Sequence, residues 1–184
     1  MYFNIRRISK VKQHLTQEAC AKVINATVVS HLDYHNALLL GITDRNMHRL
    51  QVAQNNAARC LTRTCYRQRI TPVLQQLLWL PVKQRVVFKV LTTMHKSLHS
   101  SSAPPYMREL CPTYQPQRTF KRRSSSDKWK LIVEKSSNKY GARAISTLGA
   151  QLWNNLPLEL RELRAHGAFR KNLKTLLFKR EYNL

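Results

Sequence analysis

Arginine side chains recur through segment 44–65 at spacings that place four of them along one side of a helix: Arg45, Arg49, Arg59 and Arg63. At a rise of about 1.5 Å per residue, such a stripe would be about 27 Å long. A guanidinium binds phosphate through two parallel hydrogen bonds and also stacks on unpaired bases. The stripe therefore predicts contact with a nucleic-acid backbone, and an acidic protein partner or plain solvation are the alternatives. The loop that follows would extend the patch through Arg67 and Arg69.

The opposite side of this helix is apolar, as packing against a core requires. Its members are Met47, Leu50, Ala57, Ala58, Leu61 and Cys65. Two residues break the division, because Gln54 falls within the apolar arc and Val52 within the basic one. Thr43 precedes the helix at the position where a hydroxyl caps free amide groups.

A second basic stripe is predicted on a long helix over Val82–His99, where Arg85, Lys89 and Lys96 share one side with Thr92. The core side of this helix would carry Val86, Val90, Leu91, Met94 and Leu98. Thr71 and Pro72 mark the start of a short helix that ends near Leu78, since proline is accepted in a first helical turn. A corner over residues 79–82 would separate the two helices.

The tract 118–130 combines basic and aromatic residues around a run of serines. Its basic members are Arg118, Lys121, Arg122, Arg123, Lys128 and Lys130, and its aromatic members are Phe120 and Trp129. Single-stranded nucleic acid is bound in this way, with aromatic rings stacking on bases and cations following the backbone. The alternative is an exposed hairpin loop or a disordered basic tract. Segment 131–134 is the one short strand predicted, with 119–121 as its possible mate.

The charge of the whole chain points to an anionic partner. Its 184 residues hold 32 Lys and Arg against 9 Asp and Glu, a formal net charge of +23. Nucleic acid, RNA or DNA, is the expected partner, bound with little sequence specificity. No apolar run is long enough to span a bilayer or resembles a signal peptide, so we expect no membrane partner. The 4 cysteines are irregularly spaced, which favours reduced thiols and a nuclear or cytoplasmic, not secreted, protein.

Catalytic and metal-binding patterns are missing from the sequence. The acidic residues before Glu109 are Glu18, Asp33 and Asp44, which are widely separated, whereas polymerases cluster carboxylates around two metal ions. The four glycines are too scattered for a phosphate-binding loop. His31 and His35 lie one helical turn apart but have no evident third ligand. We therefore expect no enzyme activity, no cofactor and no metal site.

The elements together predict a mostly α fold: a helical bundle of about seven to eight helices with one small β-hairpin in the C-terminal half. Further helices are expected over 2–12, from residue 19 to about 40 with Thr16 as cap and Gly41 as stop, and over 106–111, 140–153, 158–163 and 168–180. The run of serine, alanine and proline at 100–105 breaks the helical pattern. We expect a helical region over 1–99, a Pro/Ser-rich linker over 100–117 and a hairpin-plus-helix region over 118–184.

Several short motifs occur together along nearly the whole chain. They are Leu32-Asp33-Tyr34-His35-Asn36, Leu50-Gln51 with Gln54-Asn55-Asn56-Ala57-Ala58-Arg59, Ile70-Thr71-Pro72-Val73-Leu74 with Trp79-Leu80-Pro81-Val82, and Tyr140-Gly141 with Leu152-Trp153-Asn154-Asn155-Leu156-Pro157. The set resembles the segment downstream of the polymerase core in LINE-type (non-LTR) retrotransposon reverse transcriptases. His35 departs from the pattern, which usually has cysteine there.

The resemblance implies a thumb and post-thumb region that grips template RNA and primer, while the catalytic palm with its paired aspartates is not in this sequence. The expected function is that of a non-catalytic nucleic-acid-binding fragment. A helical module that binds another protein is the alternative from a different class. A transposon remnant without selected function is the third, because Met1 falls inside the region of resemblance.

Overall fold

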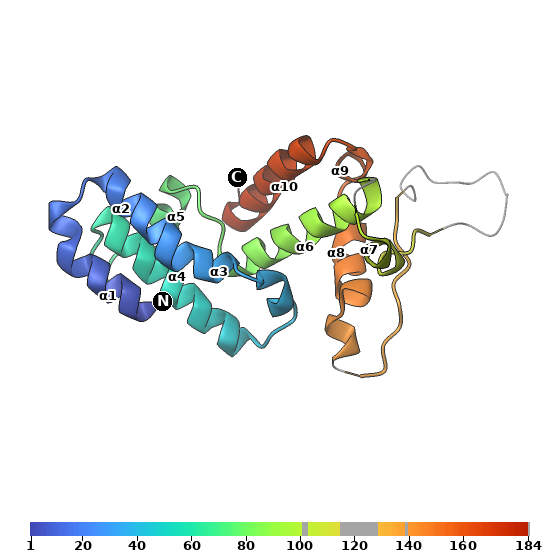
Figure 1. Ribbon diagram of the computed structural model, residues 1–184, viewed down its shortest axis with the longest axis horizontal. Helices are drawn as coiled ribbons and strands as arrows, with labels where there is room; N and C mark the ends of the chain where they lie inside the picture. Colours follow the sequence, from blue (N-terminus) through green and yellow to red (C-terminus); the bar gives the residue numbers. More distant parts are fainter. Residues whose placement is uncertain (101–102, 115–128, 139, 184) are drawn as a thin grey trace. The chain divides into compact units, whose positions relative to one another are not determined.

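The computed structural model describes residues 1–100, 103–114, 129–138 and 140–183 (Figure 1). The expected mostly α class is confirmed. The helices are α1 (Tyr2–Val11), α2 (Gln17–Ile24), α3 (Ser30–Asp33), α4 (Asp44–Thr62), α5 (Thr71–Gln76), α6 (Val82–His99), α7 (Pro105–Glu109), α8 (Ala150–Asn154), α9 (Leu158–Glu162) and α10 (His166–Tyr182). The chain groups into two compact units, Met1–Val86 and Val87–Leu184, and the division falls inside α6.

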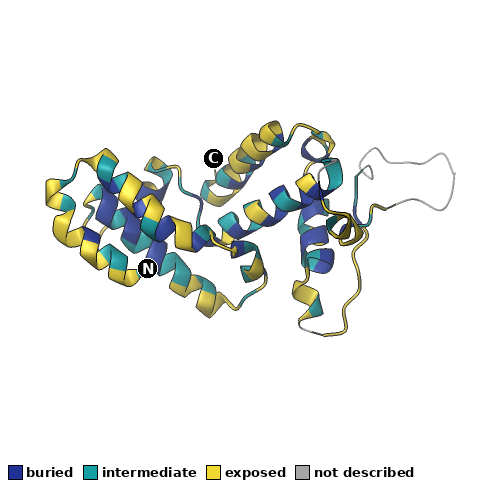
Figure 2. Ribbon diagram, in the orientation of Figure 1, coloured by how far each residue is buried: buried dark blue, intermediate teal, exposed yellow. Residues whose placement is uncertain are grey.

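The first unit is built on α4, the longest helix of this unit, against which α1 and α2 pack (Figure 1). The buried sides of these helices form one apolar cluster: Ile8, Cys20, Ile24, Val28, Val29, Ala57, Cys60 and Leu61. Small residues on α4 allow this close packing, since Ala57 and Ala58 are fully buried. The outward sides of α1 and α2 are exposed (Figure 2).

The region 17–40 consists of several short helical elements instead of one continuous helix. Thr16 caps α2 as predicted, because its hydroxyl accepts a hydrogen bond from the Ala19 amide at 3.2 Å. A π-helical turn over Asn25–Val29 then joins α2 to α3. The prediction that the helix continues to Leu40 is wrong: Tyr34 is extended, His35 has a φ of 50°, and Asn36–Leu39 is a separate 3-10 turn. The motif residues 33–36 therefore form the break between two elements.

Gln54 lies in the apolar arc of α4 because it holds the corner that precedes α6. It is fully buried, and its Nε2 donates to the Leu80 carbonyl at 2.8 Å. Gln51 completes the network, since its Oε1 accepts from the Val82 amide at 2.8 Å and its Nε2 donates to Gln54 Oε1 at 3.0 Å. The first amide of α6 thus obtains a side-chain partner, which a helix start needs.

The bounds of α6 are those predicted, whereas the C-terminal ends of α4 and α5 differ from the prediction. The residue Arg63 adopts a left-handed conformation with φ 56°, so α4 ends at Thr62 rather than near Cys65. Leu78 is likewise left-handed with φ 53°, and α5 stops at Gln76. As predicted, Thr71 and Pro72 lie at the start of α5, and Ile70 occupies its N-cap position.

The second unit packs around Trp153 and Phe169, which are fully buried. Other buried apolar residues of this unit are Val90, Leu91, Met94, Cys111, Leu131, Ala150, Leu156, Leu160, Leu173 and Leu177. The predicted helix over 140–153 is replaced by a 3-10 turn over Gly141–Arg143, a π-helical turn over Ile145–Gly149 and α8. The closing helix α10 begins two residues earlier and ends two residues later than predicted, and it buries Leu173 and Leu177.

The predicted small β-hairpin is not present among the described residues, none of which forms a strand. Leu131 makes an isolated antiparallel bridge with Thr113 instead. The backbone groups of Leu131 bond to a side chain: Asn154 Oδ1 accepts from the Leu131 amide and Asn154 Nδ2 donates to its carbonyl, both at 2.9 Å. The proposed mate, 119–121, lies outside the described residues. The expected linker over 100–117 stays a prediction, since its residues 101–102 and 115–117 are not described.

Candidate nucleic-acid interface

The arginine stripe of α4 is exposed at both of its ends. Arg45 and Arg49 are exposed in the first turns of the helix, and Arg63 is exposed at its C-terminal cap. The loop after α4 exposes Arg67 and Arg69 as well. Five of the seven predicted contact residues of the first unit are therefore exposed to solvent.

The Arg59 guanidinium, in contrast, is engaged in hydrogen bonds within the protein. Its Nη1 donates to the Cys65 carbonyl at 2.7 Å and its Nη2 donates to the Gln68 carbonyl at 2.9 Å. The guanidinium also lies 5.4 Å from the centre of the Tyr66 ring, a cation–π distance. Arg59 therefore holds the loop that carries Arg67 and Arg69, and the fork that would bind a phosphate is occupied.

Arg85 is likewise committed to a protein partner. Its Nε donates to Asp33 Oδ1 at 2.8 Å and its Nη2 to Asp33 Oδ2 at 2.5 Å, a bidentate ion pair. The Arg85 side chain is 19% exposed in this pair. Its stripe neighbours Lys89 and Lys96 belong to the second unit and are exposed.

The end of the tract 118–130 packs inward. Trp129 is half-buried with a φ of 60°, its ring centre lies 4.6 Å from that of His99, and its carbonyl accepts from the Trp153 indole at 2.7 Å. The Lys130 carbonyl accepts from the Tyr114 amide at 2.8 Å. The remaining predicted members lie outside the described residues: Arg118, Phe120, Lys121, Arg122, Arg123 and Lys128.

Two further basic surfaces were not among the predicted contacts. On α1 the exposed cations are Arg6, Arg7 and Lys10, and on α10 they are Arg170, Lys171, Lys174, Lys179 and Arg180. The signal that could have identified them is the one used for α4, a run of cations on the side of a helix opposite its apolar residues. On α1 this surface also carries an aromatic ring, since the Arg7 guanidinium lies 5.5 Å from the centre of the Phe3 ring.

Hydrogen bonds at two points connect α1 and the turn that follows it with α4 and its C-cap. The Tyr2 hydroxyl donates to the Arg49 carbonyl at 3.4 Å, and Arg63 Nη2 donates to the Lys12 carbonyl at 3.2 Å. Since the residue numbers rise together in the two pairs, α1 and α4 run side by side in the same direction (Figure 1). The cations of α1 are thus carried on the helix that flanks the stripe.

A cluster of histidines lies within the second unit. His95 is buried, its Nδ1 lies 3.3 Å from His166 Nδ1, its Nε2 lies 2.6 Å from the Leu163 carbonyl, and its ring stacks on Phe169 with centres 4.1 Å apart. Burial lowers the pKa of His95, of His99 and of His166. Lys96 and Arg170 lower the pKa of His166 further, as nearby positive charges do.

The described residues contain no helix long and apolar enough to cross a membrane. In the same part of the chain, no group of three His, Cys, Asp or Glu side chains is arranged to hold a metal ion. Comparisons of the chain with models of known families, with curated proteins and with solved structures gave no match.

Proposed function

We propose that this chain is a non-catalytic nucleic-acid-binding fragment, similar to the region downstream of the polymerase core of a LINE-type reverse transcriptase. It would grip the backbone of RNA or DNA with little base selectivity and act in the nucleus or the cytoplasm. It would need no cofactor, and the catalytic carboxylates of such a polymerase would lie elsewhere.

The observation that carries the proposal is positive charge that the protein does not neutralise itself. Even if each of the 9 acidic residues paired with one cation, 23 of the 32 Lys and Arg would remain. Two acidic residues are already engaged, because Glu18 pairs with Lys22 and Asp33 with Arg85. A polyanion is the partner that such a surface fits.

The geometry of the first unit supports a backbone contact. Arg45 and Arg49 are exposed in the first turns of α4, a helix of 19 residues, and Arg63 is exposed at the C-cap that follows its last residue. Each could place a planar fork against a phosphate oxygen pair, and none of the three forms an ion pair with a described residue that would have to break first. Arg59 would contribute indirectly, because it holds the loop that presents Arg67 and Arg69.

Charge reversal of the exposed arginines tests the proposal. The variant Arg45→Glu/Arg49→Glu/Arg63→Glu should lose most of its affinity for a labelled single-stranded RNA in fluorescence polarisation. A matched control, Lys83→Glu/Lys135→Glu/Arg143→Glu, changes the net charge equally at exposed sites off the stripe. Equal losses in the two variants would show that only total charge matters and would contradict a specific interface on α4.

Exposed apolar residues on α1 favour one alternative, a helical module that binds an acidic protein. Tyr2 is 53% exposed, Phe3 69% and Val11 49%. Under this alternative the stripe variant would keep its RNA affinity, and alanine at Phe3 would abolish capture of an acidic partner peptide. The stripe variant and Phe3→Ala together therefore separate nucleic-acid binding from protein binding.

A further inference from the structure

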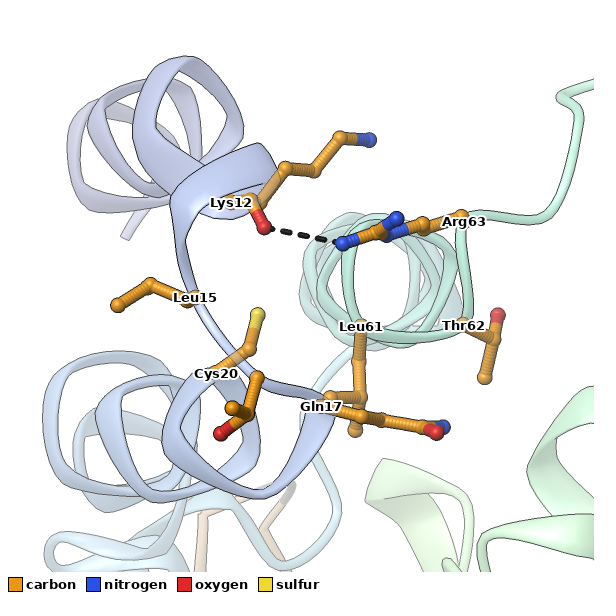
Figure 3. A pocket seen from close by; sticks show the side chains of 8 residues that line it. Lys12, Leu15, Gln17, Cys20, Leu61, Thr62 and Arg63 are labelled. Atoms are coloured by element: carbon orange, nitrogen blue, oxygen red, sulfur yellow. Dashed lines mark hydrogen bonds between the residues drawn. The ribbon is translucent and has the colours of Figure 1, made fainter.

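A pocket of about 370 Å³ opens in the first unit, next to the end of the arginine stripe (Figure 3). It lies between the loop after α1, the start of α2 and the end of α4. The residues that line it are Lys12, Leu15, Thr16, Gln17, Cys20, Leu61, Thr62 and Arg63. Its volume falls within the range of about 300–1,000 Å³ that small-molecule sites occupy.

The polar groups around this pocket favour an anion. Two of the lining residues are cationic, Lys12 and Arg63, and none is acidic. The nearest acidic residue in sequence, Glu18, is engaged with Lys22 at 2.8 Å. Arg63 Nη2 donates to the Lys12 carbonyl at 3.2 Å, which fixes the guanidinium at the pocket (Figure 3). Its other N–H groups make no hydrogen bond to a described residue, so they can bind a ligand. Gln17 adds an exposed amide to the lining.

Leu15, Cys20 and Leu61 give the pocket an apolar part beside the hydroxyl groups of Thr16 and Thr62. A bare inorganic anion would leave this apolar part unused. Leu61 is 6% and Cys20 3% exposed, and Leu15 is half-buried. Figure 3 shows the Cys20 thiol and the Arg63 side chain directed toward the same space. A ligand that fits this lining carries a negative group and a flat or apolar body.

We propose that this pocket binds one unpaired nucleotide, with its base against Leu15, Cys20 and Leu61 and its phosphate at Lys12 and Arg63. The inference rests on the proposed function and deepens it, because it adds a preference for single strands. Arg63 belongs to both the pocket and the stripe, so a strand that follows α4 reaches the pocket at the end of the helix. A nucleotide within a duplex is stacked and paired, and it cannot enter.

Titration of the ¹⁵N-labelled full chain with adenosine 5′-monophosphate tests the site directly. The backbone amides of residues 15–20 and 61–63 should shift and saturate. Adenosine alone and inorganic phosphate alone should each require at least about tenfold higher concentration, because each makes only part of the contacts. Equal potency of inorganic phosphate would show that the apolar lining is not used and would overturn the proposal, as would the absence of shifts at these amides.

Two single variants of equal charge provide the control. Lys12→Glu should weaken nucleotide binding by about tenfold or more, since it replaces a charge-assisted contact by repulsion. Lys10→Glu, on the exposed side of α1 and outside the pocket lining, should change it less than about twofold. Similar effects from the two variants would overturn the assignment.

The preference for single strands separates this inference from the proposed function. Fluorescence polarisation should show that Lys12→Glu loses the advantage of single-stranded over duplex RNA, while Lys10→Glu keeps it. If the stripe variant loses RNA affinity but the nucleotide leaves the pocket amides unshifted, the pocket assignment fails and the nucleic-acid function stands. If no oligonucleotide binds at all, the proposed function is wrong, and the pocket assignment, which rests on it, is wrong as well.

Discussion

At the scale of single residues, type and spacing predicted which arginines share a side of α4, but not which of them are free. Arg59 and Arg49 are equivalent in a helical-wheel pattern, yet Arg59 binds two carbonyls of the loop and Arg49 is exposed. The acceptors lie at Cys65 and Gln68, whose positions depend on the left-handed turn at Arg63. Such contacts arise from the folded loop, so the sequence pattern alone could not assign them.

An exposed arginine and an arginine engaged in an ion pair should respond differently to replacement by glutamine, and Arg49 and Arg85 provide the two cases. Arg49→Gln should reduce the slope of log affinity against log salt by about 1 and leave the melting temperature unchanged, because it removes one exposed cation. Arg85→Gln should reduce the free energy of unfolding by about 1 kcal/mol, because it breaks the partly exposed pair with Asp33, and it should leave the salt slope unchanged. Polarisation titrations and thermal melts of both variants check this, and a lower salt slope for Arg85→Gln would contradict it.

Gln54 provides a second prediction at this scale. Gln54→Leu should destabilise the protein by about 1–3 kcal/mol, since the buried Leu80 carbonyl would lose its donor. Gln68→Leu makes the same change at an exposed position and should alter stability by less than about 0.5 kcal/mol. Urea denaturation followed by circular dichroism measures both, and equal values for the two variants would show that the buried network does not stabilise the corner.

At the scale of elements, the long helices were predicted best because their apolar periodicity extends over many turns. The bounds of α6 agree with the prediction at both ends, and α10 differs by two residues at each end. Short or interrupted elements were predicted poorly. Segment 131–134 has the composition of a strand, but Asn154 satisfies the backbone of Leu131, so its structure depends on a residue far along the chain.

The histidine cluster makes the second unit sensitive to acid. Burial lowers the pKa of His95 and of His99 below 6.5, so the unfolded chain binds more protons than the folded one as pH falls through that value. Stability is therefore fully present above about pH 6.5 and is lost progressively below it. Lys96, Arg164 and Arg170 surround the cluster and would add repulsion to any protonated ring.

Thermal melts followed by tryptophan fluorescence between about pH 5 and 8 measure this effect, since Trp129 and Trp153 both lie in the second unit. The melting temperature should fall steadily below about pH 6.5. His48→Asn, at an exposed position of α4, should leave the pH profile unchanged. A profile that is flat across this range in the parent protein would contradict the prediction.

At the scale of the whole molecule, the sequence was sufficient for the mostly α class and for the charge. A net charge of +23 is a property of composition and does not depend on the fold. The juxtaposition of α1 with the stripe of α4 and the pocket beside Lys12 could not be predicted, because both depend on how separate helices pack. The resemblance to LINE-type reverse transcriptases stays a prediction.

The central claim, that exposed cations on rigid helices bind a polyanion backbone, is tested most directly by the salt dependence of RNA binding. If six to ten phosphates are neutralised, affinity for a labelled single-stranded RNA should fall roughly a thousandfold or more between about 50 and 200 mM salt. Fluorescence polarisation across that range gives the slope. A flat dependence, or no binding even at the lowest salt concentration, would contradict the account.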